Sequence, residues 1–383
     1  MNHANLFRWI LCAIFFFAFI PFSFAQKSDT IKIGIAGAHT GDLASYGLPT
    51  VRAAELIAGK VNAQGGILGK KVELLVEDEA CKPELATNVA TKLVSARAHA
   101  VIGHICSGAT KAALGTYKDA GLIVISPSAT SPELTYSGRY PNFHRTIAPD
   151  DAQARLVADF AVKNLKLKNI AVIHDKGDYG KGFAEFAKKY IEESGDTRVV
   201  LYEGITPGAM DYSAIVQKIR HVRADAVVYG GYHPEAASIV QLMRRRNMKA
   251  VFISDDGVKD QTFIKVAGPA AEGVYASGPM DTTNNPLAIV AINEHKKAYG
   301  TEPGAFYLNA YSAMLSVLNA IRHAKTTDSE AVLKALRTHA TDTPLGKIKY
   351  NNQGDAIGVG FSIYQVKNGV YVEMKKVQGH SGR

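Results

Sequence analysis

The sequence contains few of the features that identify enzymes, metal proteins or proteins embedded in membranes. Its 383 residues include three cysteines and one tryptophan. It has no G-x-S-x-G elbow, no phosphate-binding P-loop and no H-E-x-x-H zinc motif. The glycines at 34, 37 and 41 lack the spacing of a dinucleotide-binding loop. We therefore expect a protein that is not an enzyme and that needs neither a cofactor nor a metal ion.

The first 25 residues have the pattern of a secretory signal peptide. Arg8 supplies a positive charge, residues 9–22 form an apolar stretch too short to cross a bilayer comfortably, and Ser23 and Ala25 place small residues where a signal peptidase cleaves. We expect cleavage near Ala25-Gln26 and export; the alternative is an uncleaved N-terminal anchor. No other apolar run reaches membrane length, so the rest of the chain is expected to be soluble.

Two cysteines follow the predicted signal peptide, Cys81 and Cys106. An even number of cysteines in an exported protein favours a disulfide bond. A zinc site with His104 as a third ligand is the alternative, but these residues lack the C-x-x-C or H-x-x-x-H spacing of zinc proteins.

Charge and composition describe an ordinary globular chain. Hydrophobic residues make up 47% of the sequence, and 44 Lys and Arg against 35 Asp and Glu give a net charge of +9. The basic residues are scattered, the densest run being Arg244-Arg245-Arg246, and no nucleic-acid-binding motif accompanies them. We expect a solvated basic surface, no nucleic-acid partner, and enough length for two domains.

Strand-like and helix-like patterns alternate along the chain in two series. Strand patterns cover residues 31–36, 72–76, 100–103, 122–125, 170–173, 199–202, 226–229 and 251–253, and helical patterns cover 51–61, 83–94, 109–118, 151–165, 180–194, 211–222 and 235–246. The two series separate at Ala148-Pro149-Asp150; later, 286–340 is mainly helical and 347–376 carries short strands. This repetition predicts an α/β fold with two doubly wound lobes, each on a parallel sheet covered on both faces.

Ligands of open α/β sheets bind at the carboxyl ends of the strands. The segments at those ends are Ser45-Tyr46-Gly47, 104–107, 126–130, 174–179, 229–235 and 254–257. They are rich in hydroxyl groups and tyrosines. Ser107 with His104, and likewise His174 with Asp175, lack the partners of a catalytic triad. The acidic run 77–79 fits a solvated strand end better than a cation site.

A small-molecule binding site accounts for more of these residues than catalysis does. Ser107 lies where a strand gives way to a helix, so its hydroxyl and the amides that follow can bind an anion. Ser128 and Thr130 can add donors, which suits a carboxylate; the alternative is that Ser107 only caps the helix. Asp256, in the second lobe, can pair with an ammonium group. A ligand with both groups is an amino acid.

Five segments together resemble the periplasmic branched-chain amino acid binding proteins of ABC importers. They are Ser45-Tyr46-Gly47, Cys81 with GHICS at 103–107, SPSAT at 126–130, HDKGDYG at 174–180 and YGGYHPE at 229–235. The resemblance implies a type I periplasmic binding protein fold, whose two lobes are joined by three crossover strands and close on the ligand. By this analogy lobe 1 comprises 27–148 and 280–357, lobe 2 comprises 149–279 and 358–383, and the cleft lies between them.

Carried over residue by residue, the resemblance implies a ligand site. Ser107 matches a serine that contacts the ligand carboxylate, and the loop of Ser128, Ala129 and Thr130 completes this contact. The other matched positions are Tyr179 and Tyr232 at the ligand backbone, Asp256 with Gly257 at the ammonium group, and Tyr46 and Phe306 at the ligand side chain. For the tyrosines the alternative is packing between the lobes, and for Phe306 it is the core.

One position departs from the family pattern. Leu/Ile/Val binders usually carry glutamate where this chain has Asp256, so the carboxylate here is one methylene shorter. A branched-chain amino acid remains the expected ligand, with γ-aminobutyrate or alanine, or a ligand-sensing receptor domain, as alternatives. The resemblance further implies a periplasmic monomer that delivers a free amino acid to ABC permease subunits in the inner membrane.

Overall fold

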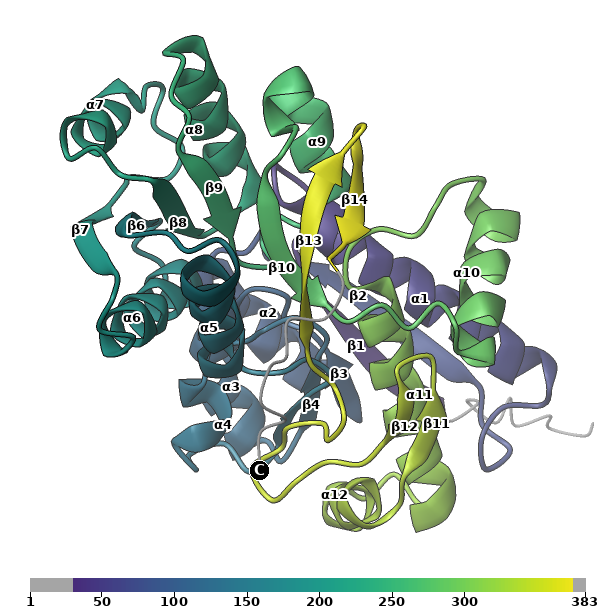
Figure 1. The fold of residues 1–383 in the computed structure, drawn as a ribbon. Coiled ribbons are helices and arrows are strands. Elements are labelled where there is room, and N and C mark those ends of the chain that lie inside the picture. The colour runs from purple at the N-terminus through teal and green to yellow at the C-terminus, as the bar shows by residue number, and fades with distance from the viewer. Residues whose placement is uncertain (1–29, 375–383) are drawn as a thin grey trace, which may run out of the picture.

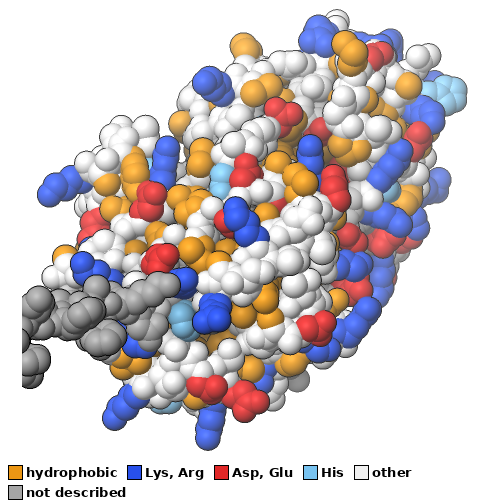
Figure 2. Space-filling model, turned by 180° about the vertical axis from the view of Figure 1, so that it is seen from behind, with side chains coloured by type: hydrophobic (Ala, Val, Ile, Leu, Met, Phe, Trp, Pro, Cys, Tyr) orange, Lys and Arg blue, Asp and Glu red, His pale blue; other side chains and the backbone are white. Residues whose placement is uncertain are grey.

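The computed structural model describes residues 30–374, which form two α/β halves, each built on its own sheet (Figure 1). The predicted signal peptide (1–25) and the end of the predicted second lobe (375–383) lie outside the described residues. Within the described range no helix is long and apolar enough to cross a membrane. On the face seen in Figure 2, Lys and Arg side chains are interspersed with Asp and Glu.

The first sheet has the strand order β2-β1-β3-β4-β5 and all its neighbouring strands are parallel. Its strands are β1 (Ile31–Gly37), β2 (Val72–Asp78), β3 (Ala100–Ile102), β4 (Ile123–Ser126) and β5 (Phe143–Arg145). Helices α1 (Ala44–Ala63), α11 (Tyr307–Ala324) and α12 (Ser329–Thr338) share one apolar core with this sheet; α2 (Pro83–Ser95) and α3 (Ser107–Asp119) share the other. Cores on both faces explain why the central strands β3 and β4 are buried along their whole length, whereas the edge strand β2 is partly exposed.

The second sheet has the order β14-β13-β10-β9-β8-β6-β7. Its strands are β6 (Asn169–His174), β7 (Arg198–Gly204), β8 (Ala226–Gly230), β9 (Val251–Ser254), β10 (Tyr275–Pro279), β13 (Phe361–Lys367) and β14 (Val370–Glu373). One face carries α5 (Asp150–Asp159) and α6 (Asp178–Glu193), and the other carries α7 (Ser213–His221), α8 (His233–Arg245) and α9 (Gln261–Ala267). The fold is therefore the predicted pair of doubly wound lobes.

Further elements complete the first half: α4 (Glu133–Tyr136), α10 (Pro286–Tyr299) and the hairpin of β11 (Thr341–Thr343) with β12 (Gly346–Ile348). In the second half, a short π-helix (Phe160–Asn164) follows α5 and a 3-10 helix (Gly268–Ala271) follows α9. The chain passes between the halves three times, through residues 146–149, 280–285 and 349–360. Residues that follow β3, β4, β8 and β9 line one cavity between the halves, as expected for the carboxyl ends of parallel strands.

Two details differ from the sequence-based expectation. Helix α1 begins at Ala44 rather than near Val51, so Ser45-Tyr46-Gly47 forms its first turn and Pro49 lies inside the helix. A side chain at Gly47 would collide with the carbonyl of Ala38, so glycine lets α1 approach that backbone closely. At the edge of the second sheet, β13 and β14 pair in antiparallel fashion, which an alternating βα pattern does not predict.

The two cysteines are joined by a disulfide bond. Cys81 follows β2 and Cys106 immediately precedes α3, with their Cα atoms 5.5 Å apart. His104 uses both ring nitrogens elsewhere: Nδ1 lies 3.0 Å from Glu79 Oε2 and Nε2 lies 2.9 Å from the Tyr117 hydroxyl. The bond ties the strand end to the start of α3, which positions Ser107.

Candidate ligand-binding site

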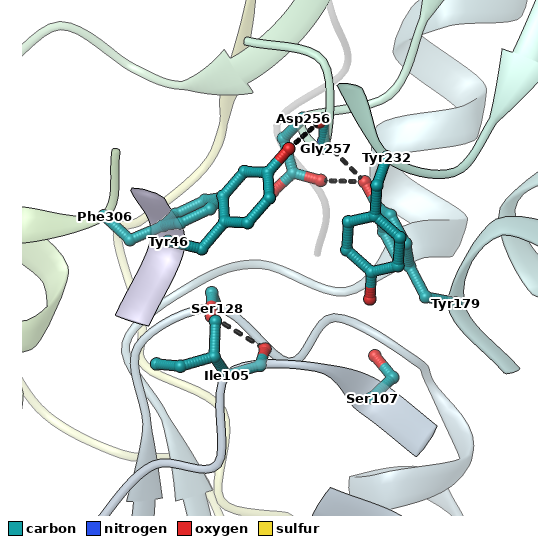
Figure 3. A pocket seen from close by; sticks show the side chains of 9 residues that line it. All are labelled: Tyr46, Ile105, Ser107, Ser128, Tyr179, Tyr232, Asp256, Gly257 and Phe306. Atoms are coloured by element: carbon teal, nitrogen blue, oxygen red, sulfur yellow. Dashed lines mark hydrogen bonds between the residues drawn. The ribbon is translucent and has the colours of Figure 1, made fainter. Parts of the chain in front are cut away.

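One cavity between the halves is lined by residues of both (Figure 3). Its lining residues are Tyr46, Ile105, Ser107, Ser128, Tyr179, Tyr232, Asp256, Gly257 and Phe306. The structure therefore brings together all but two of the site residues predicted from the sequence. The exceptions, Ala129 and Thr130, are fully buried and do not belong to the lining, whereas Ile105 does.

Ser107 lies at the first turn of α3, with its side chain at the cavity wall. The residue that precedes the helix is Cys106, and it makes no side-chain capping bond. The Ser107 hydroxyl oxygen instead accepts a hydrogen bond from the Ser131 backbone N–H at 3.2 Å. Ser107 is thus not the helix cap, and the amides of the first turn of α3 form a positive helix end beside the cavity.

The loop after β4 forms the floor of the cavity. Its turn is held by Ser126, whose Oγ donates to His104 O at 2.6 Å and accepts from the Ala129 N–H at 2.9 Å. The Ser128 hydroxyl donates to Ile105 O at 2.8 Å, a bond drawn in Figure 3. Because that proton is already used, Ser128 has acceptor capacity left rather than donor capacity.

Arg145 fixes this loop from behind. Its side chain is fully buried and its Nε lies 2.6 Å from Asp355 Oδ1. Nη1 donates to the carbonyls of Ser131 at 2.9 Å and Ala129 at 3.3 Å. One guanidinium therefore joins the loop to the last crossing segment, 349–360, with both its charge and its donors satisfied.

The second half contributes a buried carboxylate. Asp256 is 2% exposed; its Oδ1 accepts a hydrogen bond from the Tyr179 hydroxyl, while Oδ2 has no partner among the residues that the structure describes. The Tyr179 oxygen in turn accepts the Gly257 N–H at 2.8 Å. Burial raises the pKa of Asp256 to about 6, with the Tyr179 hydrogen bond acting in the opposite direction. Such a carboxylate calls for a cationic partner.

Four aromatic rings form a row that crosses from one half to the other. Ring centroids are 6.2 Å apart for Phe306 and Tyr46, 5.8 Å for Tyr46 and Tyr232, and 5.3 Å for Tyr232 and Tyr179. In Figure 3 the Tyr232 hydroxyl points toward Ser107, away from Asp256. The row forms an apolar wall between an anion-binding end and an acidic end.

Tyr46 also bonds the two halves directly. Its hydroxyl donates to Gly257 O, and His233 Nδ1 lies 2.6 Å from the same oxygen. Since the tyrosine proton is used, His233 Nδ1 acts as the donor. These bonds hold the cavity walls together, and they leave the Tyr46 ring, rather than its hydroxyl, to face a ligand.

The cavity is narrow in this arrangement. Its volume is about 20 Å³, room for roughly one water molecule. A groove of about 550 Å³ lies next to it, and Phe306 lines both. Phe306 has φ +59°, a left-handed backbone that is unusual for a bulky residue. That strained position places the ring between the cavity and the groove.

Three residues of the site were missed by the sequence analysis. Ile105 and His233 stand inside segments that were singled out, but an apolar residue and a helix-start histidine carry no signal of their own. The role of Arg145 depends on contacts between distant segments, and a charged residue at the end of a buried strand is the one hint that the sequence offers.

Comparison with known proteins agrees with the geometry. The sequence profile of the family described as "Periplasmic binding protein" matches residues 30–370. A leucine-, isoleucine-, valine-, threonine- and alanine-binding protein of Pseudomonas aeruginosa is 35% identical over 90% of this chain and 91% of its own. The Leu/Ile/Val-binding protein of Escherichia coli is 33% identical over 90% and 93%.

Solved structures show the same fold. A leucine-binding protein from Thermotoga maritima superposes with a TM-score of 0.84 at 26% identity, covering 90% of this chain and 98% of the other. The branched-chain amino acid binding protein of Streptococcus pneumoniae, in complex with isoleucine, gives 0.80 at 28% identity, covering 90% and 100%. The chain therefore belongs to the periplasmic binding protein family.

Proposed function

We propose that this protein captures a free amino acid, in the first instance leucine, isoleucine or valine, and delivers it to an ABC permease. The single observation that carries the proposal is the cavity itself. It has at one end the buried Asp256 carboxylate, whose Oδ2 has no hydrogen-bond partner within residues 30–374, at the other end a helix start with Ser107, and apolar rings between them. The names of the relatives support the same class of ligand.

Capture proceeds by closure of the cleft. The ligand carboxylate first binds the start of α3 and Ser107 on the first half, with the segment Ser128-Ala129-Thr130 behind it. The second half then closes, bringing Asp256 to the ammonium group and Tyr179 and Tyr232 to the ligand backbone. Closure excludes water, which strengthens both ion contacts.

A panel titration tests this function. The chain starting at Gln26 is screened by thermal shift and calorimetry against leucine, isoleucine, valine, threonine, alanine and γ-aminobutyrate, and the ligand is recovered and analysed for turnover. We expect saturable binding of at least one branched-chain amino acid, recovered unchanged. Failure of all six to bind, or conversion of any of them to a product, contradicts the proposal.

A smaller ligand is the second candidate. Asp256 is one methylene shorter than the glutamate usual in the family, which opens room near the ligand ammonium group. This departure favours γ-aminobutyrate or alanine, which are included in the panel for that reason. An affinity order with alanine or γ-aminobutyrate ahead of leucine would select this alternative.

The family also suggests where the protein works and how it is organised. We propose a periplasmic monomer, exported by residues 1–25, whose partners are permease subunits and no nucleic acid. The lobes are taken as 27–148 with 280–357 and 149–279 with 358–383. Light scattering of the purified protein and N-terminal sequencing of the exported form test the monomer and the cleavage site.

Ser107→Ala is expected to weaken amino acid binding by about 1–3 kcal/mol, because a hydrogen bond to the ligand carboxylate is lost in a buried site. The measurement is calorimetry at fixed pH. Ser137→Ala, at the end of α4 outside the cavity, is the matched control and should bind like the parent. A loss well below 1 kcal/mol would remove the Ser107 hydroxyl from the contact.

Phe306→Ala is expected to change selectivity more than stability. Removing the ring joins the cavity to the neighbouring groove and deletes an apolar wall worth about 1.5–3 kcal/mol to a ligand side chain. Binding of valine should weaken about tenfold or more, while methionine and phenylalanine gain relative to valine. Phe186→Ala, which removes a ring on α6, is the control. An unchanged order of affinities would show that Phe306 does not bound the side-chain pocket.

A further inference from the structure

Tyr46 makes a buried polar contact between the two halves. It belongs to α1 of the first half and is 1% exposed. Its hydroxyl donates to the Gly257 carbonyl of the second half, and it accepts from His233 Nδ1 at 2.6 Å and from the His233 backbone N–H at 3.3 Å. His233 is the first residue of α8, so the phenol oxygen lies at the positive end of that helix. One hydroxyl thus makes three hydrogen bonds to the opposite half.

The hydrogen bonds continue from Gly257 to the carboxylate that is expected to hold the ligand ammonium group. The Gly257 N–H donates to the Tyr179 oxygen at 2.8 Å, and the Tyr179 hydroxyl donates to Asp256 Oδ1 (Figure 3). A side chain at Gly257 would collide with the Gly231 carbonyl, so this stretch of backbone is closely enclosed. The bond from Tyr46 to Gly257 therefore helps to fix where Asp256 lies.

Both partners keep the protons that this contact requires. Burial, and next the charge of Asp260, raises the pKa of Tyr46 well above its ordinary value, so the hydroxyl stays protonated. Burial lowers the pKa of His233 below its ordinary value. At pH 7 the His233 ring is therefore neutral, with its proton on Nδ1 directed to Tyr46. The contact is complete between neutral groups and needs no part of the ligand.

A second hydrogen bond between the halves lies at the surface. Lys111 Nζ on α3 donates to Asp178 Oδ1 on α6 at 3.2 Å, and these side chains are 39% and 45% exposed. An ion pair so exposed to water contributes little free energy. The contact made by Tyr46 is buried, so its loss should weaken the association of the halves more than loss of the surface pair.

We propose that the Tyr46 hydroxyl and His233 form a latch between the halves, which favours the closed cleft to the same degree whichever amino acid is bound. The Tyr46 ring faces the cavity, and His233 does not belong to the cavity lining. The hydroxyl and the imidazole are thus positioning groups. Because the latch bonds form only when the halves meet, their loss should speed ligand release rather than slow ligand entry. The effect on ligand release rests on the proposed function; closure itself is measurable without a ligand.

Tyr46→Phe removes the hydroxyl and keeps the ring, so it separates the latch from the side-chain pocket. Each amino acid that binds the parent should bind about five- to fiftyfold more weakly, by the same factor within about twofold, because buried hydrogen bonds are lost. Stopped-flow kinetics should place this loss in the dissociation rate. Tyr212→Phe removes a hydroxyl that donates to Thr206 O at 3.0 Å inside the second half, and it should bind like the parent. Unchanged dissociation rates, or a loss confined to one ligand, would overturn the inference.

His233→Ala tests the same contact from the second half. It should also speed the release of every ligand. Combined with Tyr46→Phe, it should cost less than the product of the two single losses, because residues that act through one contact are not additive. Single losses that multiply in the double variant would show that the two groups act separately, and the latch would be refuted.

A ligand-independent measurement separates the latch from the proposed function. Gly108 on α3 and Asp178 on α6 lie in opposite halves, and a Cβ at Gly108 would lie 4.0 Å from Asp178 Cβ. That separation suits a disulfide bond. In protein carrying Gly108→Cys and Asp178→Cys, the rate of cross-linking without ligand therefore reports how often the halves close. Adding Tyr46→Phe should slow cross-linking at least about twofold, whereas adding Tyr212→Phe should leave the rate unchanged.

The latch and the proposed function can fail separately. If no amino acid binds but Tyr46→Phe slows cross-linking, the proposed function fails and the latch stands. If amino acids bind and cross-linking proceeds at the same rate with and without Tyr46→Phe, the latch is refuted and the proposed function stands.

Discussion

Asp256→Ala is expected to abolish amino acid binding at concentrations where the parent protein is saturated. The substitution leaves the ligand ammonium group buried without a counter-charge, which costs about 3–5 kcal/mol. That corresponds to an affinity loss of about a hundredfold to a few thousandfold. The measurement is isothermal titration calorimetry with the tightest ligand of the panel. Because Asp256 Oδ1 accepts a hydrogen bond from Tyr179, circular dichroism must show that the variant is folded.

Three further variants test whether the charge of Asp256 binds the ligand ammonium group. Asp256→Asn keeps the shape and removes the charge, so it should lose nearly as much affinity as alanine. Asp256→Glu restores the residue usual in the Leu/Ile/Val binders and should bind far better than asparagine. Asp119→Ala, an exposed acid at the end of α3, is the control. Unchanged affinity in Asp256→Asn would mean that the ammonium group lies elsewhere.

Arg145→Ala is expected to be the most destabilising single change near the site. It leaves Asp355 without its cation and strips the carbonyls of Ala129 and Ser131 of their donor, with a cost of about 3–5 kcal/mol in the free energy of unfolding. Urea denaturation of the parent and the variant measures the loss. The loop after β4 should also lose its order, so binding at the cavity weakens together with stability.

A nearby arginine provides the matched comparison. Arg139 carries the same charge six residues earlier, but its side chain is 64% exposed and pairs with Glu133 on the surface. Arg139→Ala should change the free energy of unfolding by less than about 1 kcal/mol. Equal losses in the two variants would show that the buried network around Arg145 contributes no more than a surface ion pair.

The sequence predicts the fold well because its pattern is local. Apolar runs such as Ile31–Gly37 are too short for a helix and are followed by amphipathic stretches, so the order of strands and helices can be inferred without tertiary information. The antiparallel edge formed by β13 and β14 depends instead on how the last segment returns to the second sheet. Its direction is set by the pairing of β13 with β10, a contact between distant segments that no local pattern predicts.

The sequence predicts those site residues that follow the carboxyl end of a strand, because ligands of open α/β sheets bind there. Ser107, Ser128 and Asp256 follow strands directly, and the structure gathers all three around one cavity. The role of Arg145 was not predicted because its partner, Asp355, is distant in sequence. Likewise the bond of Tyr46 to Gly257 joins residues of opposite halves. Contacts of this kind follow from the assembled fold and not from spacing.

The central claim is that the cavity binds an amino acid by both its charged ends. It is tested most directly by titrating the same protein with leucine, leucinamide and 4-methylpentanoate in one buffer. Leucinamide lacks the carboxylate for Ser107 and the start of α3, and 4-methylpentanoate lacks the ammonium group for Asp256. The account predicts that leucine binds and that each analogue binds at least about a hundredfold more weakly. Binding of either analogue with the affinity of leucine would contradict it.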